Sequence, residues 1–205
     1  MRYYTFYIAA ACVLAFIIQS VVPGFTDAFL LDSAKVLYEP WLLVTSMFLH
    51  GGLEHILYNM FALLLFGIML EHIIGGKRFI RLYFMAGIIA SIGSAIFYPQ
   101  SLGASGAIYG IIGCLAVLRP RMTVWVFNIP MPMIIAAVLW AAIGVFGIFF
   151  PSTTADAAHL FGMFFGMAYA FPLRRAFGER HERRAAEKVL SEEEMEEWEG
   201  KYMRQ

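Results

Sequence analysis

Six apolar stretches dominate this chain and constrain its fold more than any other feature. They cover about residues 4–22, 52–70, 80–98, 104–118, 131–150 and 157–173. Proline, glycine and charged residues separate them, as is usual where helices end. Stretches of roughly 20 apolar residues are typical of helices that cross a bilayer. The sequence therefore predicts an all-α membrane protein with six transmembrane helices.

The composition agrees with this fold. Hydrophobic residues make up 60% of the 205 residues, charged residues make up 15%, and the mean hydropathy is +0.70. A soluble domain of this length has a much larger polar share. The formal net charge is zero, so the charge does not indicate a nucleic-acid partner. Both cysteines, Cys12 and Cys114, lie in apolar stretches, which argues against a disulfide framework or a zinc site.

The basic residues predict how the chain is oriented. Of the 15 Lys and Arg residues, all except Lys35 fall on one side of the predicted spans. Because basic loops stay in the cytoplasm, we expect a multi-pass protein of the cell (inner) membrane with both termini cytoplasmic. Residues 1–173 would form the membrane domain, and residues 174–205 a charged cytosolic tail with a short helix.

Few polar side chains occur inside the predicted spans, and such residues are functional candidates because they are costly in lipid. They are His55 and Asn59 in the second span, Ser105 in the fourth and His159 in the sixth. At the rise of an α-helix, each lies roughly 18–24 Å from the cytosolic end of its span. The sequence thus predicts that they meet at one depth near the outer surface.

The faces of these helices also agree. His55 and Asn59 are four residues apart and share a face. Two pairs of small residues would let the fourth and sixth helices approach closely: Gly106 with Gly110, and Gly162 with Gly166. Ser105 would then reach His159, and Tyr109, one turn below the serine, could pack on the imidazole. Taken singly, each residue more often serves helix packing, a cap or a hydrogen-bond network.

Together these residues supply the parts of acyl transfer. An imidazole can activate a serine hydroxyl, and the intermediate needs donors aimed at its oxyanion. The backbone amide of Ser105, the Asn59 amide and the His55 ring N–H are candidate donors. Asp156, three residues before His159, is expected to cap the sixth helix, with a third-member role in a triad as the alternative.

At this point the chain resembles the rhomboid intramembrane serine proteases over roughly residues 1–173. The matching motifs are Gly103-Ala104-Ser105-Gly106, the His55–Asn59 pair in "HGGLEHILYN", and "AHLFGMFFG" with His159, Gly162 and Gly166. The chain is similar to minimal six-helix prokaryotic members. The chain differs from many relatives at Leu42, which follows Trp41 where they have Arg. This difference affects how the first loop is held in place.

The resemblance implies a Ser105–His159 dyad, an oxyanion hole of Asn59, His55 and the Ser105 amide, and transmembrane helices as substrates. It also implies that Tyr109 stacks on the catalytic histidine, that His50 anchors a loop, and that residues 23–50 form a membrane-embedded first external loop. The fifth helix and residues 151–156 would gate substrate entry, with three candidate gate residues: Phe146, Phe149 and Phe150. No metal or cofactor is expected.

Two other functions remain open at this stage. A catalytically silent rhomboid-like protein would bind membrane clients without cleaving them. A small transporter or proton channel would use His55, His159 and Glu71. We expect loss of cleavage on Ser105→Ala to separate the first from a protease, and pH-dependent flux to reveal the second.

Overall fold

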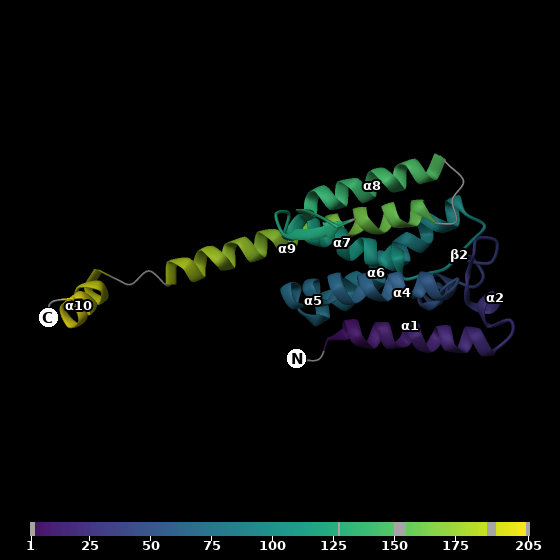
Figure 1. The fold of residues 1–205 in the computed structure, drawn as a ribbon, viewed down its shortest axis with the longest axis horizontal. Helices are drawn as coiled ribbons and strands as arrows, with labels where there is room; N and C mark the ends of the chain where they lie inside the picture. Colours follow the sequence, from purple (N-terminus) through teal and green to yellow (C-terminus); the bar gives the residue numbers. More distant parts are fainter. Residues whose placement is uncertain (1–2, 127, 150–154, 188–191, 204–205) are drawn as a thin grey trace. The chain divides into compact units, whose positions relative to one another are not determined.

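The computed structural model describes residues 3–126, 128–149, 155–187 and 192–203. Contacts divide the chain into two units, which meet at Phe171–Pro172 and are described separately. In the first unit the helices lie roughly parallel, with α1 and α8 at opposite sides (Figure 1). In the order of the chain its elements are α1 (Tyr4–Val21), α2 (Phe25–Phe29), β1 (Leu31–Asp32), α3 (Leu42–Thr45), a 3-10 turn (Ser46–Phe48), α4 (Leu53–Ala62), a π-helical turn (Leu63–Gly67), α5 (Ile68–Ile74), α6 (Gly76–Phe97), β2 (Gln100–Ser101), α7 (Ser105–Leu118), β3 (Thr123–Val126), β4 (Ile129–Pro132), α8 (Met133–Phe149) and the first part of α9 (Asp156–Glu187).

Within the described residues, three helices are long and apolar enough to cross a membrane: Tyr4–Val21, Leu53–Ile74 and Gly76–Phe97. The helices α7 and α8 are apolar but shorter. The prediction of a mostly helical, apolar protein is confirmed. The second unit contains the end of α9 and α10 (Glu192–Tyr202), where Met195 and Trp198 are exposed.

One helix boundary differs from the prediction. The fifth apolar stretch was expected to be helical from about residue 131, but residues 129–132 form β4, which pairs antiparallel with β3. Pro130 and Pro132 disfavour a helix interior because proline lacks an amide N–H. Asn128, with φ of 63°, makes the turn between the strands. Helix α8 therefore begins only at Met133.

A buried carboxylate secures the first helix. The first N–H groups of a helix lack partners inside it, and a negative charge near them is favourable. Glu71 supplies both needs for α1: its carboxylate accepts hydrogen bonds from the Tyr4 and Thr5 amides at 2.7 and 2.9 Å and from the Thr5 hydroxyl at 2.7 Å. Since Glu71 is only 3% exposed, this contact joins α1 firmly to α5.

Small residues bring α7 into close contact with two neighbours. A Cβ atom on Gly106 or Gly110 would collide with the side chains of Ala90 and Ala86 on α6. On the other side of α7, a Cβ atom on Gly162 or Gly166 would collide with the carbonyl oxygens of Gly106 and Gly110. The helices α7 and α9 thus meet backbone to backbone, which fixes the position of the first residues of each.

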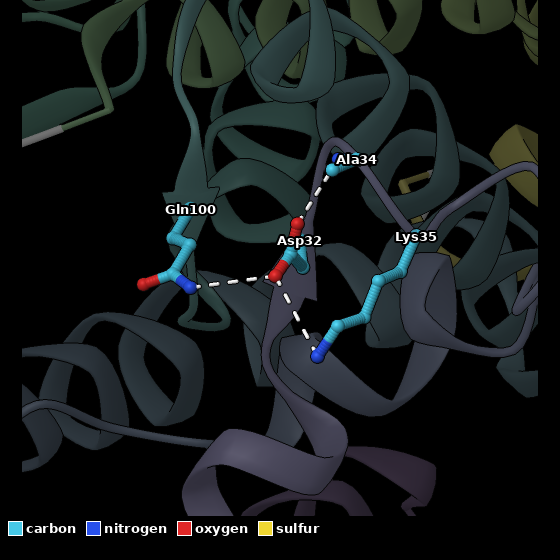
Figure 2. Close-up of polar contacts among 4 residues, drawn as sticks. All are labelled: Asp32, Ala34, Lys35 and Gln100. Carbon is cyan, nitrogen blue, oxygen red and sulfur yellow. Dashed lines mark hydrogen bonds and ion pairs between the residues drawn. The ribbon is translucent and has the colours of Figure 1, made fainter.

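The long connection after α1 is bonded to the segment that leads into α7. Strand β1 pairs antiparallel with β2, with Leu31 opposite Ser101 and Asp32 opposite Gln100. Figure 2 shows how the Asp32 carboxylate accepts hydrogen bonds from the Ala34 amide and the Gln100 side chain, at 3.0 and 3.4 Å, and lies 3.7 Å from Lys35 Nζ. These contacts, the Ala34 amide first, lower the pKa of Asp32. Their contribution to folding is present above the ordinary pKa of the carboxyl group and is lost as the pH falls through the lowered value.

Candidate active site

Ser105 is the first residue of α7, and residues 102–104 connect it to β2. At this position the backbone amides of the first helical turn have no partner within the helix. Gly103, two residues earlier, has φ of 130°, a conformation that side chains of L-residues rarely adopt, and its amide donates to the Ser46 carbonyl at 2.9 Å. The serine is half-buried. A glycine turn therefore delivers a hydroxyl to a helix N-terminus with free N–H groups.

His159 lies opposite this hydroxyl, on the second turn of α9. Its Nε2 atom is 2.8 Å from Ser105 Oγ, within hydrogen-bond distance. The Tyr109 ring is stacked on the imidazole, with the ring centroids 4.3 Å apart and an angle of 2° between the planes. The side chain of His159 is 12% exposed. Tyr109 and the close approach of α9 to α7 thus hold the imidazole against the serine.

The other ring nitrogen of His159 faces a carboxylate. Asp156 is the first residue of α9, and its Oδ1 lies 3.9 Å from His159 Nδ1. The residue is buried, with 7% of its surface exposed. This places an acidic group on the side of the imidazole that is remote from the serine.

His55 presents one ring nitrogen toward the turn before Ser105. Its Nδ1 accepts a hydrogen bond from the Gly51 amide at 3.2 Å, so in the neutral ring the proton resides on Nε2. That Nε2 lies beside Gly103, where a Cβ atom would be 3.0 Å from it. The His55 N–H therefore points to the region next to the serine.

Asn59 is buried one turn further along α4. Its Nδ2 donates to the His55 carbonyl oxygen of the same helix at 2.8 Å. Its Oδ1 has no hydrogen-bond partner among the described residues. Because a side-chain amide carries two N–H groups, one of them remains available to another acceptor.

His50, 2% exposed, occupies the end of the long connection. Its backbone forms two hydrogen bonds with the side chain of Gln19 on α1: the His50 amide donates to Oε1 at 3.0 Å, and Nε2 donates to the His50 carbonyl at 3.3 Å. The His50 ring packs edge-on against His55, with the centroids 5.2 Å apart. The residue thus joins the connection both to α1 and to His55.

A small cavity lined partly by hydroxyl groups adjoins Ser105. Its volume of about 20 Å³ holds roughly one water molecule. Beside Ser105, four serines line it: Ser46, Ser91, Ser94 and Ser101. The Ser94 hydroxyl donates to the Ser101 hydroxyl at 2.7 Å. None of these serines was predicted as a site residue, although Ser91 and Ser94 are three residues apart in an apolar helix and therefore share a face.

Two of the three candidate gate residues, Phe146 and Phe149, lie on α8. Phe146 and Phe149 are 63% and 77% exposed. Phe150 and residues 151–154 of the predicted gate lie outside the described residues. Two of the three gate candidates thus lie on α8 with largely exposed side chains.

Comparison with known proteins adds an independent finding. The family model described as the rhomboid domain matches residues 38–176, more than half of the chain. The chain belongs to the rhomboid family. This matched region includes the long connection from residue 38 onward and every polar residue of the candidate site, so the rhomboid domain and the site coincide.

Three relatives illustrate the similarity. Rhomboid protein 1, mitochondrial, of Saccharomyces cerevisiae is 33% identical over 159 residues, which cover 69% of this chain and 44% of the yeast protein. Rhomboid protease GluP of Bacillus subtilis is 34% identical over 148 residues, covering 69% of this chain and 28% of GluP. Rhomboid protease GlpG of Haemophilus influenzae is 25% identical over 173 residues, covering 82% of this rhomboid chain and 88% of GlpG. The chain thus spans less than half the length of the yeast protein and of GluP.

Proposed function

We propose that the protein is an intramembrane serine endopeptidase that cleaves transmembrane helices near the extracytoplasmic side of the membrane. The observation that carries this proposal is the distance of 2.8 Å between Ser105 Oγ and His159 Nε2 at the start of a buried helix. The names of GluP and GlpG, both rhomboid proteases, support the same activity. Six membrane crossings, by α1, α4–α5, α6, α7, α8 and α9, and a first external loop embedded in the membrane belong to this proposal.

In the first step Ser105 Oγ attacks the carbonyl carbon of the scissile peptide bond. A C–O bond forms, the hydroxyl proton passes to His159 Nε2, and the carbonyl electron pair moves onto oxygen. The amide of Ser105, the Nε2–H of His55 and the free N–H of Asn59 are the donors for this oxyanion. The C–N bond then breaks, and the leaving amine takes the proton from His159.

The second step consumes water. A water molecule attacks the acyl-enzyme carbonyl, His159 accepts its proton, and the ester C–O bond to Ser105 breaks as the hydroxyl regains a proton. The cavity beside Ser105 has room for this water. A substrate helix must unwind locally before the reaction, because its carbonyl groups are otherwise held in internal hydrogen bonds.

Replacing Ser105 tests the proposal. We expect Ser105→Ala and His159→Ala to lower cleavage of a model transmembrane substrate in proteoliposomes by at least about 1,000-fold, because the two groups act as a unit. Both variants should also lose labelling by a fluorophosphonate serine probe. Ser20→Ala, which removes an exposed hydroxyl on α1 bonded only to its own helix in the described contacts, is the matched control.

The outcomes separate the alternatives. Cleavage that survives Ser105→Ala would contradict the assignment. If neither the wild type nor the variant cleaves any substrate, a silent binder of membrane clients is favoured. A transporter would require Glu71 to serve a proton path, whereas its carboxylate accepts the hydrogen bonds that cap α1.

A further inference from the structure

The carboxylate of Asp156 lies on the side of the His159 ring that faces away from Ser105. The distance between Asp156 Oδ1 and His159 Nδ1 is 3.9 Å, while the Nε2 atom of the same ring is 2.8 Å from Ser105 Oγ. Only 10% of the Asp156 side chain and 12% of the His159 side chain are exposed. The acid, the imidazole and the hydroxyl therefore follow one another in a largely desolvated row.

The neighbouring helix leaves room for this carboxylate. A Cβ atom on Gly147 of α8 would collide with Asp156 Oδ2 and lie 3.0 Å from Oδ1. At the same turn, the Ala157 amide donates to the Tyr98 hydroxyl at 3.2 Å, which holds the start of α9 against the end of α6. The position of the acid is thus set by α6 and α8 as well as by its own helix.

We infer that Asp156 is a positioning residue for His159, which supports the Ser105–His159 dyad through its charge. This inference rests on the proposed protease function. The carboxylate favours the tautomer that carries a proton on Nδ1, and this leaves Nε2 free to take the proton of Ser105. It then stabilises the imidazolium that forms as the serine attacks.

The distance decides which of these effects dominates. At 3.9 Å no direct hydrogen bond is made, so the carboxylate acts mainly through its charge. Charge attraction at this separation is strong where water is scarce, and it grows at the moment when His159 becomes positive. The other ionisable groups that face the imidazole are Tyr109 on α7 and His55 on α4, and neither is anionic near neutral pH.

The test is to measure kcat/KM as a function of pH for Asp156→Asn and for the wild type, both as full-length protein in proteoliposomes. Asparagine has nearly the same shape as aspartate but no charge, so the substitution chiefly removes the negative charge. We expect kcat/KM near neutral pH to fall by about 10- to 100-fold, since charge attraction of this kind is lost in the transition state. The acidic limb of the profile should move to lower pH, because a less basic imidazole stays neutral in stronger acid.

Control variants exclude a merely structural role. Asp27→Asn removes another acid from the first turn of an external helix and should leave the profile unchanged. Gly147→Ala should displace the carboxylate and shift the acidic limb in the same direction as Asp156→Asn. In an Asp156→Ser background, which has no carboxylate to displace, Gly147→Ala should cause no further shift of the limb.

The result that would overturn the inference is distinct from failure of the protease function. If the wild type cleaves and Ser105→Ala does not, the function stands; an acidic limb unmoved in Asp156→Asn, with or without lower activity, then removes Asp156 from the mechanism. If the wild type does not cleave at all, the inference falls together with the proposed function.

Discussion

Gly103 has a backbone conformation that no other residue adopts easily, and it also borders a candidate oxyanion donor. Its φ is 130°, and a Cβ atom at this position would lie 3.0 Å from the His55 ring. Both the backbone conformation and the space beside His55 therefore require glycine at this position. The turn thus couples the orientation of Ser105 to that of His55, although the two residues come from different helices.

We expect Gly103→Ala to destabilise the protein by about 1–3 kcal/mol, the usual cost of a strained backbone conformation. We also expect it to lower kcat/KM at least about tenfold, since displacing His55 removes an oxyanion donor. Denaturant unfolding in detergent and cleavage in proteoliposomes measure the two effects. Gly52→Ala is the control, because Gly52 is extended and a Cβ atom there meets nothing within 4 Å. Normal kinetics in Gly103→Ala would contradict this account.

At the scale of residues, the features of the site that could be predicted from the sequence are those that follow from helical periodicity. The position of Tyr109 one turn after Ser105, and the absence of side chains at Gly162 and Gly166, follow from the sequence because each residue belongs to a regular helix face. The distance of Asp156 from the imidazole and the lining of the small cavity depend on how α6, α8 and α9 pack. No local pattern specifies that packing, so these features required the structure.

At the scale of elements, α7 and α9 pack backbone against backbone. The Gly162 backbone lies directly against the Gly106 carbonyl oxygen, which is part of a helix and cannot move independently. Any added side-chain atom must separate the two helices that carry Ser105 and His159. Stability and activity therefore depend on the same contact.

We expect Gly162→Ala to destabilise the protein by about 1–3 kcal/mol, as overpacking of a filled interior does. Cleavage should fall more steeply than stability, because the hydroxyl and the imidazole are moved apart. Thermal unfolding in detergent, followed by cleavage assays well below the melting temperature, separates the two. Gly200→Ala on the exposed helix α10 should instead be neutral or slightly stabilising. Equal effects of the two substitutions would contradict this interpretation.

Element boundaries were less predictable than the elements themselves. The apolar run after residue 131 reads as one helix by composition, yet its first residues pair with β3. The signal was present in Pro130 and Pro132, which interrupt a helix. Strand pairing between short segments is a tertiary contact, and hydropathy alone does not reveal it.

At the scale of the whole molecule, the basic residues give the proposed topology a direct test. The only lysine expected outside is Lys35, whose side chain is 53% exposed. We expect a membrane-impermeant amine reagent to modify Lys35 in intact spheroplasts and to reach Lys77 and Lys201 only after permeabilisation. Mass spectrometry of the labelled peptides is the measurement, and Lys35→Arg is the control. Modification of Lys77 in sealed spheroplasts would invert the proposed orientation.

The pairing of β1 with β2 has a practical consequence for engineering. A graft that replaces residues 23–50 with the corresponding segment of a relative also removes one strand of the ribbon that leads to Ser105. Such a chimaera would keep every residue of the dyad and still present its nucleophile at a different angle. Residues 23–50 and 99–104 are therefore best exchanged together. A chimaera designed to alter substrate choice should replace both segments with those of the same relative.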